Sequence, residues 1–132
     1  MTSEIVFVGE PEQGSTRPFS RAARAGGLIF VSGHAAPHEP DSGIFRGKTA
    51  GEQVNQSLAF IRQILEAEGS GLDCVVQVTM LITDPEDYAE CNTAYAKHFQ
   101  NGLPARHTAR FGVPTDAKVA FACIATAGNT EK

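Results

Sequence analysis

The feature that most constrains the fold is the uncharged stretch from Val119 to Ala125. Alternation along a strand gives it two apolar faces, with Val119, Phe121, Cys123 and Ala125 on one and Ala120, Ala122 and Ile124 on the other. A strand that is apolar on both faces is covered on both faces. In a chain of 132 residues, helices can cover one face of a sheet, and the other must pack against something else, most simply a second copy of the chain.

This strand is the second of two that the sequence predicts between Pro104 and Ala125. Arg106 follows Pro104 where a loop becomes a strand, so its backbone is restrained while its guanidinium is free to project. Residues 113–116 supply the turn of this predicted hairpin, because Pro114 presets φ and the next two polar side chains can bond their own backbone. An arginine in this position is well placed to bind an anion.

Composition limits the class of function. Hydrophobic residues make up 42% of the chain and charged residues 20%, which fits a single domain over residues 1–132. A net charge of −4, without a run of Lys or Arg, argues against nucleic acid as a major ligand. No apolar run approaches the roughly 20 residues of a membrane-spanning helix. The N-terminus lacks the pattern of a signal peptide, so we expect a cytoplasmic protein without a membrane partner.

The cysteines and histidines do not have the spacing of metal ligands. The three cysteines are odd in number and lack Cys-x-x-Cys spacing, which predicts buried free thiols rather than a disulfide framework or a zinc site. The four histidines share no spacing either. We therefore expect neither a metal nor a cofactor.

The N-terminal part of the chain predicts three strands and a loop. Residues 4–9 are rich in β-branched residues and predict a short edge strand. Residues 19–25 and 28–32 flank Gly26-Gly27, the two-residue pattern of a tight hairpin, and the continuous apolar run at 28–31 predicts a central strand. Residues 34–48 contain several Pro and Gly residues and predict a long loop.

Two helices separated by a strand follow. Thr49 and Glu52 have the spacing of a capping box and begin a helix that ends near Gly69. Residues 72–83 predict a buried strand, and Asp84 begins a second helix. The apolar face of that helix is expected to comprise Tyr88, Cys91, Tyr95 and Phe99.

This order of elements predicts an α+β fold, a mixed β-sheet with two helices packed on one face. The second face of the sheet then has no cover within the chain. Three such sheets could close edge to edge into a barrel-like core, which would place any pocket between subunits.

With these elements placed, the sequence resembles the RidA family, also called YjgF, of small trimeric proteins that hydrolyse reactive enamine and imine intermediates. The resemblance covers about residues 17–126. The matching segments are Arg17-Pro18-Phe19-Ser20, Gly27-Leu28-Ile29-Phe30-Val31-Ser32-Gly33, Glu52-Gln53 with Leu58, Asp84 with Asn92 and Tyr95, and Pro104-Ala105-Arg106. The resemblance implies a fold like that of the trimeric chorismate mutases, with a barrel-cored homotrimer.

The resemblance also implies a site for a small carboxylate. In deaminating members the arginine of Pro-Ala-Arg binds the substrate carboxylate, and here this is Arg106, whose planar guanidinium can donate two parallel hydrogen bonds. An ion pair within the trimer is the alternative role of this arginine. The expected substrate-binding residues are Arg106, Phe19, Ser32, Gly33, Asn92, Thr108 and Phe121. For Ser32 and Asn92, hydrogen bonds that only tie down backbone are an equal alternative.

Two positions depart from the deaminating members. Many of these carry a glutamate on the last strand where this chain has Ala120, and Phe19 replaces a common tyrosine. Imine hydrolysis needs a proton on nitrogen and an activated water at carbon, so the two losses leave binding better supported than catalysis. His34, directly after Ser32-Gly33, is the candidate catalytic proton carrier, although a surface histidine is the commoner outcome. His107 is expected to point away from Arg106.

Three functions follow from the sequence. The first is a hydrolytic deaminase of small enamine or imine intermediates bearing a carboxylate, which releases ammonia at inter-subunit clefts. The second is a non-catalytic small-carboxylate-binding or chaperone-like protein that uses the same cleft. An endoribonuclease is the third, and an acidic chain without a basic groove supports it least.

Overall fold

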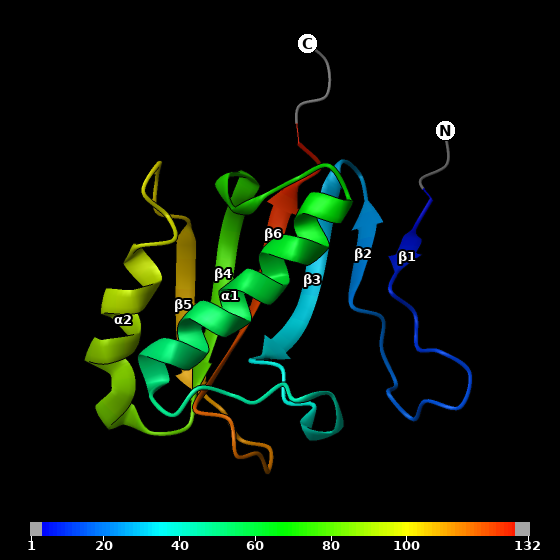
Figure 1. Cartoon of the computed structure of the whole chain (residues 1–132). Helices are drawn as coiled ribbons and strands as arrows, with labels where there is room; N and C mark the ends of the chain where they lie inside the picture. Colours follow the sequence, from blue (N-terminus) through cyan, green and yellow to red (C-terminus); the bar gives the residue numbers. More distant parts are fainter. Residues whose placement is uncertain (1–3, 129–132) are drawn as a thin grey trace.

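A computed structural model describes residues 4–128. It contains one six-stranded mixed sheet with two α-helices on the same face (Figure 1), which confirms the predicted α+β fold. The strands are β1 (Val6–Val8), β2 (Ala22–Ala25), β3 (Leu28–Ala35), β4 (Val75–Ile82), β5 (Ala105–Arg110) and β6 (Val119–Thr126). The helices are α1 (Ala50–Ala67) and α2 (Tyr88–Ala96), and short 3-10 turns span Pro40–Ser42, Leu72–Cys74 and Pro85–Asp87.

The strand order across the sheet is β1-β2-β3-β6-β4-β5. The predicted hairpin between β2 and β3 is confirmed, and both turn glycines have positive φ, +61° at Gly26 and +79° at Gly27. The expected hairpin between β5 and β6 is wrong, because β4 lies between them, antiparallel to β6 and parallel to β5. The strand that is apolar on both faces thus takes an interior place, and the strand with charged residues takes the edge.

The first helix begins at its predicted cap, whereas the second begins one 3-10 turn after its predicted cap. The capping box of α1 is confirmed: the Thr49 hydroxyl accepts from the Glu52 backbone N–H at 3.1 Å, and the Glu52 carboxylate accepts from the Thr49 N–H at 3.1 Å. The Asp84 carboxylate accepts from the Glu86 N–H at 2.9 Å, but a 3-10 turn follows and α2 begins only at Tyr88. The second helix is therefore shorter than expected.

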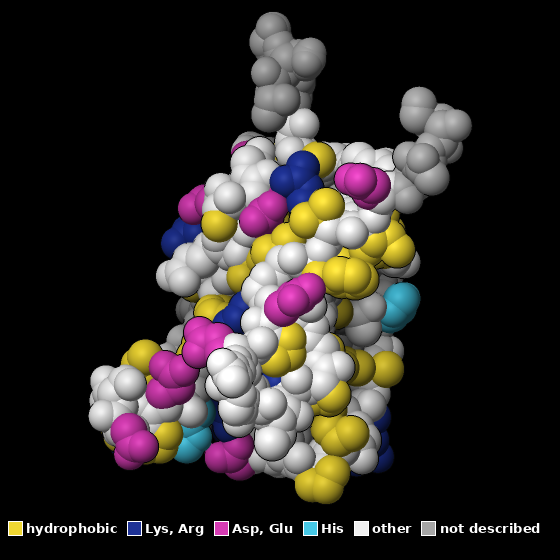
Figure 2. Space-filling view, turned by 90° about the vertical axis from the view of Figure 1, so that its right-hand side faces the viewer, with side chains coloured by type: hydrophobic (Ala, Val, Ile, Leu, Met, Phe, Trp, Pro, Cys, Tyr) yellow, Lys and Arg dark blue, Asp and Glu magenta, His cyan; other side chains and the backbone are white. Residues whose placement is uncertain are grey.

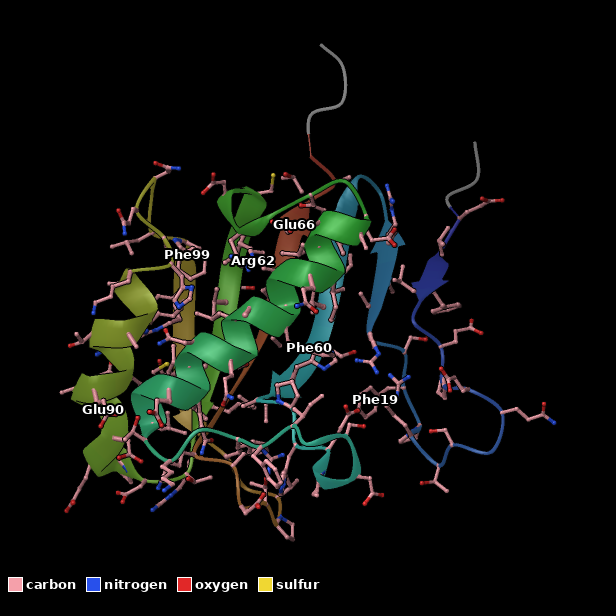
Figure 3. The ribbon with its side chains drawn as sticks, in the orientation of Figure 1. Phe19, Phe60, Arg62, Glu66, Glu90 and Phe99 are labelled. Atoms are coloured by element: carbon pink, nitrogen blue, oxygen red, sulfur yellow. The ribbon has the colours of Figure 1, made fainter. Side chains whose placement is uncertain are left out.

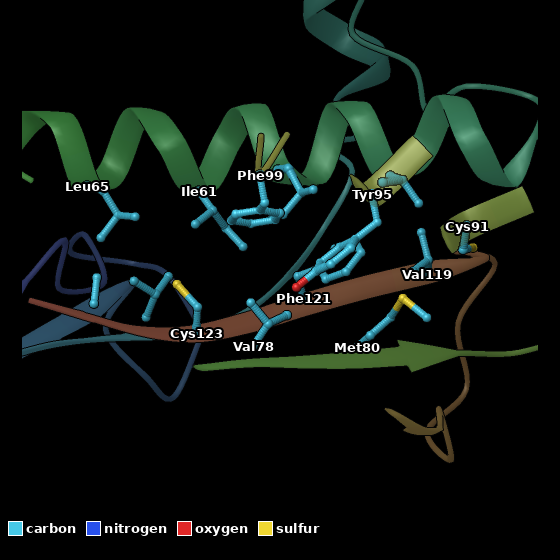
Figure 4. Close-up of a cluster of buried hydrophobic side chains, with 14 of the residues drawn as sticks. Ile61, Leu65, Val78, Met80, Cys91, Tyr95, Phe99, Val119, Phe121 and Cys123 are labelled. Carbon is cyan, nitrogen blue, oxygen red and sulfur yellow. The ribbon is translucent and has the colours of Figure 1, made fainter. Parts of the chain in front are cut away.

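The core lies between the helices and the covered face of the sheet (Figure 4). Its fully buried members include Ile29, Val54, Leu58, Ile61, Leu65, Val78, Met80, Val119 and Phe121. The ring of Phe121 stacks on that of Tyr95 at a centroid distance of 5.8 Å, which fixes α2 against the middle of the sheet.

The other face of the sheet carries apolar side chains that no helix in the described part of the chain covers. Phe30 is 41% exposed, and its cross-strand partner Ile124 is half-buried. Leu81 on β4 lies on the same face. Figure 2 views the molecule from the β1 edge and shows exposed hydrophobic side chains there. Of the helices in residues 4–128, none combines the length and apolar character needed to cross a bilayer.

Candidate functional site

Arg106 is the centre of the site at the β5 edge. It is the second residue of β5, and its side chain lies against α2. The guanidinium carbon is 4.8 Å from the ring centre of Tyr95 and 5.8 Å from that of Tyr88. One guanidinium nitrogen, Nη2, donates a hydrogen bond to the Tyr88 hydroxyl at 3.2 Å. Two aromatic rings two helical turns apart therefore hold the guanidinium in place, each contact contributing about 0.5–2 kcal/mol.

The charge of Arg106 is not neutralised by a carboxylate in residues 4–128. The ion pairs in this part of the chain involve other arginines, as Arg24–Glu68, Arg46–Asp116 and Arg62–Glu66. A half-buried guanidinium with N–H groups to spare is suited to bind a carboxylate or another oxyanion.

The same face of α2 carries further polar atoms. Asn92 lies one turn after Tyr88, and Tyr95 lies two turns after it. The Asn92 Oδ1 and the Tyr95 hydroxyl are buried and have no hydrogen-bond partner among residues 4–128. Burial raises the pKa of Tyr95 above its usual 10.0, and the nearby Arg106 opposes this effect, so the phenol stays protonated. Thr108 follows Arg106 by two residues on β5 and is half-buried on the same face. We call this set the Arg106 half-site: Tyr88, Asn92, Tyr95, Arg106 and Thr108.

A second group of expected residues lies at the β2–β3 end of the sheet. Phe19 and Ser32 line a hollow of about 450 Å³, together with Phe7 and Phe30. The Ser32 hydroxyl donates to the Ser20 carbonyl at 2.6 Å, so it ties down backbone, as the alternative interpretation expects. Phe19, Ser32 and Gly33 form what we call the Phe19 half-site.

His34 does not face the Arg106 half-site. A register shift in β3 between Val31 and His34 turns the imidazole onto the helix-covered face, where its ring centre is 5.2 Å from that of Phe60. Figure 3 labels Phe60 on α1 and Phe19 on the N-terminal segment. The His34 Nε2 donates to the Arg21 carbonyl at 3.1 Å. Burial lowers the pKa of His34, so the imidazole is neutral near pH 7.

The structure corrects one expected binding residue and places two further residues that the sequence analysis discussed. Phe121 is 0% exposed in the core, so the expectation that it forms a wall of the pocket is wrong, because the covered face of β6 packs beneath the helices. Ala120 lies on the opposite face of β6, is 2% exposed and pairs with Leu81. The prediction for His107 is confirmed: it points away from Arg106 and its Nε2 is 2.7 Å from the Thr79 hydroxyl.

Sequence reasoning missed the part that Tyr88 plays. The apolar spacing of the second helix assigned its ring to the core, yet it is 44% exposed and contacts Arg106. The sequence did contain a signal for this role. The side chains at residues 88, 92 and 95 share one face of the helix, and each carries a polar atom. Within residues 4–128, no cluster of three His, Cys, Asp or Glu side chains could hold a metal.

Within one chain, the two half-sites lie toward opposite edges of the sheet. The Arg106 half-site is on β5 and α2 at one edge, whereas the Phe19 half-site is beside β2 and β3, with β6 and β4 between them. A single chain therefore does not bring them together.

Comparison with known proteins gives a consistent result. A family model described as Endoribonuclease L-PSP matches residues 10–127. The chain is 36% identical over 110 residues to a protein of Arabidopsis thaliana named Reactive Intermediate Deaminase A, chloroplastic, covering 83% of this chain and 58% of that protein. It is also 36% identical over 112 residues to a RutC family protein of Sinorhizobium fredii, covering 84% of this chain and 88% of the relative.

A solved structure supports the same assignment. The crystal structure of a YjgF family member from Neisseria meningitidis matches with a TM-score of 0.78 and 29% identity, over 93% of this chain and 94% of that one. The matched family model covers nearly all of the sheet and both helices. The chain therefore belongs to the YjgF/RidA family, the group whose family model is described as Endoribonuclease L-PSP.

Proposed function

We propose that the protein is a hydrolytic deaminase of small enamine or imine intermediates that bear a carboxylate, and that it releases ammonia. The observation that carries this proposal is the guanidinium of Arg106, which is held by two tyrosine rings and has no carboxylate partner within residues 4–128. Such a group binds the carboxylate of a small acid in a fixed orientation.

The site is completed in a cleft between subunits of a homotrimer with a barrel-like core. Two features of one chain support this assembly. The Arg106 and Phe19 half-sites lie toward opposite edges of the sheet. The face that carries Phe30 and Ile124 is apolar, and no helix of residues 4–128 lies over it. Packing these faces together removes apolar surface from water and brings the Phe19 half-site of one copy to the Arg106 half-site of the next.

A non-catalytic protein that binds small carboxylates is the second candidate. The residue that favours it is Ala120, which supplies no carboxylate to activate water. His34 does not compensate within one chain, because its ring lies beneath α1 against Phe60. A binder of this kind keeps the Arg106 clamp and has no turnover.

The experiment is to measure the release of ammonia from enzymatically generated imines of several amino acids, followed as the loss of semicarbazone formation. We expect the wild type to be active and Arg106→Ala to lose about 10²-fold or more in kcat/KM, because two charge-assisted hydrogen bonds are each worth about 1.5–3 kcal/mol. Arg110→Ala is the matched control, since Arg110 is an exposed arginine further along β5.

Two other results point to different functions. A wild type that binds carboxylates through Arg106 without turnover, and that gains turnover in Ala120→Glu, is a binder that has lost the hydrolytic group. Cleavage of RNA with a rate that falls steeply with salt supports the endoribonuclease of the family description instead. The cytoplasmic location stays a prediction, because relatives include proteins named chloroplastic and mitochondrial.

A further inference from the structure

We propose that Tyr88 is the proton-donating residue of the Arg106 half-site. This inference rests on the proposed deaminase function and adds a chemical role that Arg106 itself cannot supply, because a guanidinium is always protonated and does not release its proton in proteins.

The hydrogen-bond geometry leaves the Tyr88 proton free to be donated. A guanidinium can only donate, so the Tyr88 oxygen is the acceptor of the 3.2 Å bond from Arg106 Nη2. The hydroxyl proton of Tyr88 therefore points to another partner. The side chain is 44% exposed, which makes this proton accessible to a small molecule bound at the guanidinium. The remaining N–H groups of Arg106 are available for the carboxylate of that molecule.

Other titratable groups of α2 are less suited to the role. The Tyr95 hydroxyl is buried, and burial raises its pKa. Cys91 is 0% exposed, and burial, followed by the charges of Asp87 and Glu90, raises the pKa of its thiol to about 11. The Glu90 carboxylate accepts from the Gly51 N–H at 2.7 Å, which directs it to the first turn of α1.

The reaction step balances without an oxidant or a reductant. The Tyr88 hydroxyl gives its proton to the nitrogen of the imine, whose lone pair forms the new N–H bond, and the product is an iminium ion. The phenolate left on Tyr88 is stabilised by the hydrogen bond from Arg106. Water adds to the iminium carbon and returns a proton to the phenolate. The hydroxyl proton of the adduct then passes to its nitrogen, the C–N bond breaks as the C=O bond forms, and ammonia and a keto acid are released, with one water consumed.

The test compares Tyr88→Phe, Tyr88→Ala and the wild type in the imine assay. We expect Tyr88→Phe to lower kcat by about 10²-fold with little change in KM, because the ring that supports Arg106 remains and only the proton donor is lost. Tyr88→Ala removes the ring as well and raises KM in addition. Thr93→Val is the matched control, since it removes an exposed α2 hydroxyl that bonds the Ala89 carbonyl within the helix.

The outcomes separate this inference from the function on which it rests. Loss of kcat in Tyr88→Phe, with the circular dichroism spectrum and the Thr93→Val activity unchanged, supports the proton-donating role. A Tyr88→Phe protein with the kcat of an active wild type overturns that role and leaves the deaminase function in place. A wild type that hydrolyses none of the imines overturns both.

Discussion

The site has a stability cost at the level of single residues. The Asn92 Oδ1 and the Tyr95 hydroxyl are buried without partners in the part of the chain that the structure describes, and a buried polar group that is left unpaired costs about 1–3 kcal/mol. Neither atom is needed for the core, because Cys91, Phe99 and Phe121 already fill it. A hydroxyl retained at this cost on the Tyr95 ring, which lies against Arg106, is more consistent with binding than with packing.

His34 gives a prediction about the pH dependence of stability. Burial is the largest effect and lowers the pKa of His34 below the ordinary value of 6.5. The hydrogen bond to the Arg21 carbonyl opposes it, and the charges of Arg21 and Arg17 lower the pKa further. Below pH 6.5 the unfolded chain therefore binds the proton more readily than the folded chain. We expect the free energy of unfolding to fall as the pH drops below about 6.5 and His34→Gln to lose this part of the slope.

Urea denaturation at several pH values checks this prediction directly. The informative quantity is the difference in unfolding free energy between the wild type and His34→Gln, which we expect to change with pH below 6.5. An imidazole resonance of His34 with its titration midpoint at or above 6.5 would contradict the expected direction.

The residues that sequence reasoning placed correctly are those whose position depends on local rules. Arg106 lies at the start of a strand because a proline precedes it, and His107 points away from it because strands alternate. The direction of the His34 side chain could not be predicted, because the register shift in β3 between Val31 and His34 reverses the alternation and leaves no mark in the sequence pattern. Tyr88 was assigned to the core because an apolar ring at helical spacing does not reveal that an arginine from β5 meets it.

At the scale of elements, sequence reasoning identified the helices, the strands and the first hairpin. It failed on the order of the last two strands, because a short turn between two apolar segments favours a hairpin locally. The structure inserts β4 between them, which gives β6 hydrogen-bonded neighbours on both sides. Burying the most apolar strand at the centre outweighs the local preference.

The capping box of α1 gives an element-scale prediction. Thr49→Ala removes the acceptor of the Glu52 N–H, so we expect the free energy of unfolding to fall by about 1 kcal/mol. The measurement is urea denaturation monitored by circular dichroism. Thr49→Ser retains the hydroxyl and is expected to stay close to the wild type, and equal stability of the Ala and wild-type proteins would show that the cap is not formed.

At the scale of the whole molecule, the proposed trimer depends on the uncovered sheet face. Phe30→Glu places a charge on this face, and burying an unpaired charge in an interface costs several kcal/mol. We expect this variant to sediment as a monomer, with loss of imine hydrolysis, while the wild type sediments as a trimer.

A second variant controls for the added charge. Phe45 is 58% exposed in the segment before α1, and Phe45→Glu is expected to leave the sedimentation coefficient unchanged. A wild type that is monomeric at micromolar concentration, or a Phe30→Glu protein that is still trimeric, would show that this face is not the interface.

The opposite placement of the two half-sites has a genetic consequence. In the proposed trimer, each copy lends its Arg106 half-site to one cleft and its Phe19 half-site to another. A copy with a defective Arg106 therefore inactivates one cleft, but it still supplies an intact Phe19 half-site to another cleft. In a cell that expresses two alleles, such a defect lowers activity in proportion to the share of defective copies, and an allele damaged in one half-site complements an allele damaged in the other.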